Sequence, residues 1–176
     1  VNPETRMLQR VGDFRFPSDG NTHAMTDLAV DAMGRVTGVT EDAVYSINPD
    51  TAACTLVRAL PTATRRVFVG LTWMPVGVLD PSNEVLVGGA TDGSLWRINP
   101  ASGTTSMVAT LPSGWGISGD MVSIRGAATY ATVRPTTGTS TTDTLVTLTF
   151  SGSSVRMTRV GDVGFRSIYG LGYWRQ

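Results

Sequence analysis

Apolar residues occur along this chain in short runs, and most runs end at Gly, Pro, Asn or Asp. Representative apolar runs are residues 28–30, 85–87 and 121–122. No stretch of useful length shows the 3.6-residue apolar period of an amphipathic helix. The pattern therefore predicts an all-β chain of short strands joined by tight turns.

One turn motif recurs along the chain and sets its period. It consists of an apolar residue, Asn-Pro, any residue, and then Thr or Ser, and the Asn residues are Asn2, Asn48 and Asn99. A weaker fourth copy lies at residues 149–152. Asn suits the first position of a turn and Pro presets φ at the second position. The motif therefore predicts hairpin turns in a repeat of about 45 to 50 residues.

Four strand-like runs fall within each repeat. The predicted first strands are residues 27–30, 70–73, 120–123 and 170–173, and the second strands are 35–39, 84–88 and 128–133. The third strands are 43–47, 94–98 and 144–148, and the fourth are 7–11, 55–58, 106–110 and 156–160. Four short strands per repeat are typical of a β-propeller blade. A β-sandwich stays open as an alternative.

The repeat also resembles a known group of proteins. Residues 27–31 read Asp-Leu-Ala-Val-Asp, Gly34 follows, and an aromatic residue, Tyr45 or Trp96, stands two positions before Ile-Asn-Pro. This pattern resembles the blades of bacterial β-propeller repeat proteins, including NHL-like and related six- or seven-bladed propellers. The resemblance implies four-stranded antiparallel blades of about 45–50 residues. It implies no reaction, because propellers host many functions.

The order of the repeats predicts an incomplete ring. We expect a single partial propeller domain over residues 1–176, divided into the end of one blade (1–23), three blades (24–66, 67–116 and 117–166) and the first strand of another (167–176). Three blades do not close a ring, so the remaining strands are expected from further blades of a longer protein or from a homo-oligomer. Otherwise apolar faces would stay in water.

Charge and composition exclude several classes of function. The chain has 14 basic residues, all Arg, and 14 acidic residues, so its net charge is zero. A phosphate backbone needs a surplus of positive charge, which argues against nucleic-acid binding. No apolar run is long enough for a membrane span. A lone Cys54 and a lone His23 exclude an internal disulfide and a Cys/His zinc site.

Candidate catalytic groups are few. Ser18, Asp19 and His23 have the residue types of a catalytic triad but lie in one loop, whereas triad members converge from separate elements. No paired-carboxylate, calcium-loop or phosphate-loop pattern is visible. We therefore expect no catalytic residue, no metal and no cofactor.

Loops that precede the first strands are the expected binding surface. In a propeller these loops, at residues 16–24, 61–68, 112–118 and 161–167, gather on one face. The candidate binding residues there and at the adjoining strand starts are Asp19, His23, Arg65, Arg66, Trp115, Arg166, Asp27 and Asp120. Structural roles are the alternative for each: Trp115 would pack between blades, Arg65 and Arg66 would be solvated, and the two strand aspartates would bond neighbouring blades.

These features favour a non-enzymatic binding or scaffold protein with a protein or glycan partner. We expect an extracellular, cell-surface or periplasmic location, although no signal-peptide pattern is present. A lectin-like propeller is one alternative, but it predicts an equivalent aromatic residue in every repeat, and only Trp115 fits. A lactonase-like or other hydrolase propeller is another, with catalytic residues partly outside this chain.

Overall fold

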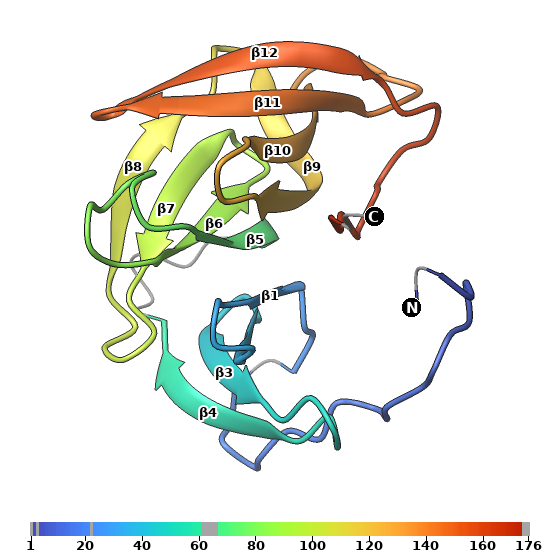
Figure 1. Ribbon diagram of the computed structural model, residues 1–176, viewed down its shortest axis with the longest axis vertical. Helices are drawn as coiled ribbons and strands as arrows, with labels where there is room; N and C mark the ends of the chain where they lie inside the picture. The colour runs from blue at the N-terminus through green and yellow to red at the C-terminus, as the bar shows by residue number, and fades with distance from the viewer. Residues whose placement is uncertain (1, 3, 22, 61–66, 174–176) are drawn as a thin grey trace.

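A computed structural model of the protein describes residues 2, 4–21, 23–60 and 67–173. Within these residues the fold is all-β, as the sequence predicts, and it contains three four-stranded antiparallel sheets. Each sheet is built from four strands in chain order (Figure 1). The described part of the chain contains no helix with the length and apolar character needed to cross a bilayer.

Most strands match the predicted ones, but β9 begins at Trp115, inside the predicted loop 112–118 and before the predicted blade boundary at 117. Sheet 1 contains β1 (Asp27–Val30), β2 (Val36–Val39), β3 (Ala43–Ile47) and β4 (Cys54–Ala59). Sheet 2 contains β5 (Phe68–Met74), β6 (Val85–Ala90), β7 (Ser94–Ile98) and β8 (Thr105–Thr110). Sheet 3 contains β9 (Trp115–Ser123), β10 (Thr129–Pro135), β11 (Thr144–Ser151) and β12 (Ser154–Asp162).

The Asn-Pro motifs form the turns that the sequence predicts. Asn48 lies between β3 and β4, where its Oδ1 accepts the N–H of Asp50 and of Thr51 at 2.9 and 3.1 Å. Asn99 repeats this arrangement between β7 and β8, with Ala101 and Ser102 as donors. The Asn side chain thus satisfies backbone donors that the turn leaves unpaired.

The core lies between the sheets. One buried cluster joins sheets 1 and 2 and contains Phe68, Leu86 and Ile98, and another joins sheets 2 and 3 around Ile117 and Met121. Ile47, Ile98 and Leu148, which end the three predicted third strands, are all buried. Ile47 and Ile98 end their strands, whereas β11 continues past Leu148 to Ser151.

The prediction of an incomplete propeller ring is wrong. Sheet 2 lies between sheets 1 and 3, and the three sheets are not arranged as a ring (Figure 1). The expected outer strand at 7–11 and the expected inner strand at 170–173 are not strands. A strand forms only where a neighbour pairs with its backbone, and neither segment has such a neighbour among the described residues.

Candidate functional site

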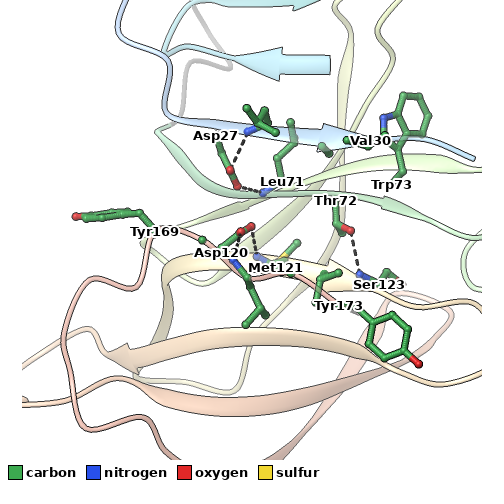
Figure 2. Close-up of a pocket in the computed structure, with 16 residues that line it drawn as sticks. Asp27, Val30, Leu71, Thr72, Trp73, Asp120, Met121, Ser123, Tyr169 and Tyr173 are labelled. Carbon is green, nitrogen blue, oxygen red and sulfur yellow. Dashed lines mark hydrogen bonds between the residues drawn. The ribbon is translucent and has the colours of Figure 1, made fainter. Parts of the chain in front are cut away.

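A cleft of about 570 Å³ opens where the first strands of the three sheets approach one another (Figure 2). Its walls come from β1, β5, β9 and the segment 169–173. We call it the inner-strand cleft. It is lined by Asp27, Leu28, Ala29, Val30, Leu71, Thr72, Trp73, Asp120, Met121, Val122, Ser123, Tyr169, Gly170, Leu171, Gly172 and Tyr173. Segments from all three repeats therefore share one cavity.

Asp27 connects sheet 1 to sheet 2 at the base of this cleft. Its Oδ1 accepts the N–H of Leu28 on the same strand at 2.7 Å. Its Oδ2 accepts the N–H of Leu71 on β5 at 2.5 Å. Leu71 lies on the inner edge of β5, so the carboxylate pairs a backbone donor that no strand covers.

Asp120 on β9 repeats this arrangement two repeats further along the chain. Its Oδ1 accepts the N–H of Met121 at 2.5 Å, and its Oδ2 accepts the N–H of Leu171 at 2.6 Å. Its own N–H donates to Thr132 Oγ1. In both cases the aspartate precedes an apolar residue of an inner strand. Its carboxylate accepts the N–H of the leucine at the equivalent position of the next repeat.

The two carboxyl groups face each other across β5 (Figure 2). Burial and the negative charge of Asp120 raise the pKa of Asp27 to about 8. Burial also raises the pKa of Asp120, against the lowering effect of its hydrogen bonds to Leu171, Asp27 and Met121. At neutral pH the pair therefore shares one proton, carried by Asp27 and directed at Asp120.

The carboxyl pair is a feature that the sequence analysis missed. The sequence shows no paired-carboxylate pattern, because the pair is formed by aspartates from different repeats. Asp27 and Asp120 were both named as candidates at equivalent repeat positions. That equivalence was the available signal, because the first strands of all three sheets line one cleft.

Glycines let the inner segments approach closely enough to form the pair. A Cβ at Gly70 would lie 2.9 Å from Met121 Cγ and 3.3 Å from the carbonyl carbon of Asp120. A Cβ at Gly119 would overlap the carbonyl oxygen of Ile168. Larger residues at either position would push β5 or the 168–173 segment away from β9.

The rim of the cleft is apolar and exposed. Leu28, Val30, Tyr169 and Tyr173 are 41%, 54%, 69% and 56% exposed. Apolar side chains that stay this exposed around a concave surface are characteristic of a contact surface. Trp73 lies partly buried on the wall, and its Nε1 has no hydrogen-bond partner.

Two other predicted residues form a separate cluster outside the cleft. His23 Nε2 lies 2.8 Å from Asp19 Oδ1, and the Tyr45 hydroxyl donates to Asp19 Oδ2 at 3.0 Å. The ring of Phe16 stacks on the imidazole with ring centroids 4.6 Å apart. The cluster anchors the loop before β1 to β3 of sheet 1.

The electrostatics of this cluster point to a structural role. Burial alone would raise the pKa of Asp19, but hydrogen bonds from His23, Asn21 and Tyr45 outweigh it and lower the pKa. Burial and the neighbouring Asp19 carboxylate raise the pKa of Tyr45. Asp19 therefore remains a carboxylate and Tyr45 a neutral donor across the usual pH range, which keeps the contact intact.

Removing the Tyr45 hydroxyl tests this role. We expect Tyr45→Phe to lower the free energy of unfolding by about 1 kcal/mol, because Asp19 loses one donor while the ring still fills its buried space. Urea denaturation at pH 7 measures the change. Tyr169→Phe removes the hydroxyl of an exposed tyrosine and is expected to leave stability unchanged. Equal stabilities of all three proteins would contradict the anchoring role.

The remaining candidates that the structure describes are Trp115 and Arg166. Trp115 begins β9 and packs, partly buried, against the cluster between sheets 2 and 3. Arg166 is exposed in the loop after β12. Arg65 and Arg66 lie outside the described residues. The structure therefore brings Asp27 together with Asp120 and Asp19 together with His23.

The metal-ligand types do not cluster either. Within residues 2, 4–21, 23–60 and 67–173, no three His, Cys, Asp or Glu side chains lie close enough to hold a metal ion. Cys54 is a buried free thiol in β4. Burial raises its pKa, and a protonated thiol is a poor nucleophile.

Comparisons with known proteins assign no family. No family model matches the chain, and no curated protein matches it. Among solved structures, the chain is similar to the computationally designed Ika4 protein, with a TM-score of 0.38 and 15% identity over 88% of this chain and 100% of that one. A likeness this weak carries no argument. The resemblance to bacterial propeller proteins is therefore wrong, since no propeller family is matched and the sheets form no ring.

Proposed function

We propose that this chain is a non-enzymatic binding module that recognises a protein partner through the inner-strand cleft. The observation that carries the proposal is the cleft itself, which combines a 570 Å³ hollow with exposed apolar and aromatic side chains on its rim. Concave apolar surfaces with a few convergent polar groups are the usual form of a ligand site.

The hydrogen bonds of the carboxyl pair favour binding over hydrolysis. Each of the four oxygens of Asp27 and Asp120 already accepts a backbone N–H. These contacts hold the walls of the cleft together, and a general base would have to abandon one of them to reach a substrate proton. The pair is therefore better suited to maintaining the cleft than to catalysis.

A selection experiment tests the proposal. A displayed library of linear peptides, a glycan array and a panel of ester and lactone substrates would be presented to the protein. We expect peptides to be enriched, and we expect Val30→Ser to weaken the best peptide about tenfold because Val30 lines the cleft. Met33→Ser, which changes a side chain that is 80% exposed and does not line the cleft, should have no effect.

Other outcomes of the same experiment contradict the proposal. Equal peptide binding by wild type and Val30→Ser would place recognition elsewhere. Selective glycan binding would support the lectin alternative, and turnover of an ester or lactone would support a hydrolase. Melting temperatures of both variants would be measured to show that the fold is retained.

A further inference from the structure

Residues 168–173 occupy the position of an inner strand beside β9. The N–H of Leu171 donates to Asp120 Oδ2 at 2.6 Å, just as the N–H of Leu71 on β5 donates to Asp27 Oδ2 at 2.5 Å. The N–H of Ile168 donates to Asp143 Oδ2 at 3.2 Å. Figure 2 shows Tyr169 and Tyr173 at opposite ends of the cleft, so the segment spans its length. The segment is therefore held at Leu171 on the edge that faces Asp120 and at Ile168 on the other edge.

Apart from Ile168, the residues on the opposite edge of this segment have no hydrogen-bond partner within the described part of the chain. In an antiparallel sheet, successive residues direct their backbone groups to opposite edges. Because Leu171 directs its N–H to Asp120, Gly170 and Gly172 present their backbone groups to the other edge. On β5 the equivalent edge pairs with β6, where Leu71 stands opposite Gly88. Gly170 and Gly172 are exposed, and neither makes a hydrogen bond within the described part of the chain.

The three sheets share a rule for what pairs with an inner strand. The residue opposite the central apolar position is small in every sheet: Leu28 faces Gly38, Leu71 faces Gly88, and Met121 faces Ala131. In sheets 1 and 2 the facing glycine must stay small, because another apolar side chain fills the space beside it. That side chain belongs to the residue two positions before Asp27 in sheet 1 and two positions before Gly70 in sheet 2. A Cβ at Gly88 would lie 2.6 Å from Phe68 Cδ1, and one at Gly38 would lie 2.5 Å from Met25 Sδ.

The segment 168–173 has the same arrangement of residues. Ile168 stands two positions before Gly170, as Phe68 does before Gly70. We propose that this segment is a strand-addition site, at which an extended strand of a partner protein pairs antiparallel with it and places Gly or Ala opposite Leu171. The inference rests on the proposed binding function and specifies how the partner is held: backbone hydrogen bonds supply affinity and the small residue supplies specificity.

A second copy of this chain does not fit the rule. In an antiparallel pair, residues whose backbone groups point away from the shared edge stand opposite one another. Leu171 is such a residue, so it would face Tyr169, Leu171 or Tyr173 of an antiparallel copy. None of these residues is small. The segment therefore favours a different polypeptide, with a strand of the β6 type, in which Gly follows an apolar run.

The test uses a synthetic peptide with the sequence of residues 83–91, which contains β6. We expect the full chain to bind it and the amides of Gly170 and Gly172 to exchange hydrogen at least about tenfold more slowly in its presence. A control peptide with Gly88→Val should bind about tenfold more weakly, because its side chain would meet Ile168. Titration calorimetry measures both affinities, and mass spectrometry measures the exchange.

Variants of the protein separate the backbone from the side chain. Gly172→Pro removes the N–H at the free edge and should abolish the slower hydrogen exchange that the peptide causes. Gly172→Ala is the control: it adds a side chain but keeps the N–H, so it separates loss of the donor from addition of a side chain. No atom lies within 4 Å of a Cβ at Gly172, so Gly172→Ala should retain the wild-type melting temperature, and the melting temperature of Gly172→Pro is measured beside it.

Several results would overturn the inference. These are equal binding of the two peptides, unchanged binding by Gly172→Pro, protection at β4 or β12 instead of Gly170 and Gly172, or protection that grows with protein concentration without peptide. The last would assign the edge to a second copy. If strand addition fails while a library peptide still depends on Val30, the proposed binding function stands and only its mode is rejected.

Discussion

Raising the pH from 5 to 7 is expected to lower the free energy of unfolding by about 2–3 kcal/mol. The cause is the carboxyl pair of Asp27 and Asp120. The pKa of Asp27 is about 8 in the folded chain, against 3.8 for a free side chain. Between these values the folded state holds one proton more than the unfolded state. Stability is therefore greatest near pH 4 and falls by about 1.4 kcal/mol per pH unit until Asp27 ionises.

Urea denaturation at pH 5, 6 and 7 measures this slope, and Asp27→Asn is the matched variant. Asn is neutral at every pH and its oxygen can still accept the N–H of Leu71, so the variant should lose most of the slope. Among the described residues, no Arg or His side chain lines the cleft. No cation there therefore offsets the negative charge that Asp27 gains when it ionises beside Asp120. A slope unaffected by the substitution would exclude proton sharing.

The second large effect is expected in the core between sheets 1 and 2. Ile98 ends β7 and is 1% exposed, in a cluster with Phe68 and Leu86. We expect Ile98→Ala to lower the free energy of unfolding by about 2–5 kcal/mol, because it removes buried methyl groups and leaves a cavity. Phe68 and Leu86 lie on two strands of the same sheet, which limits how far the site can collapse.

Met33→Ala is the control for this substitution, because its side chain is 80% exposed. It should change stability by less than about 0.5 kcal/mol. Thermal and urea unfolding of both variants would be compared with the wild type. A loss below about 1 kcal/mol for Ile98→Ala would show that the sheets are not held together by this cluster.

The candidate site was only partly visible in the sequence. Asp27 and Asp120 could be named because they occupy equivalent places in their repeats. Their shared proton could not be predicted, because it depends on the distance between the sheets and on burial, neither of which is a local property. Tyr45 joins Asp19 and His23 for the same reason: the loop before β1 folds back onto β3, and only long-range packing determines that contact.

Local sequence determined the all-β class, the four-strand order of each sheet and the Asn-Pro turns, since these depend on the alternation of side chains and on the backbone preferences of Asn and Pro. Tertiary structure alone decided what residues 7–11 and 170–173 became. Their composition is that of strands, but a strand also needs a paired neighbour. It likewise decided that the sheets form no ring, because the packing of one sheet on the next depends on buried side chains from distant parts of the chain. Phe68 packs between sheets 1 and 2, and Met121 packs between sheets 2 and 3.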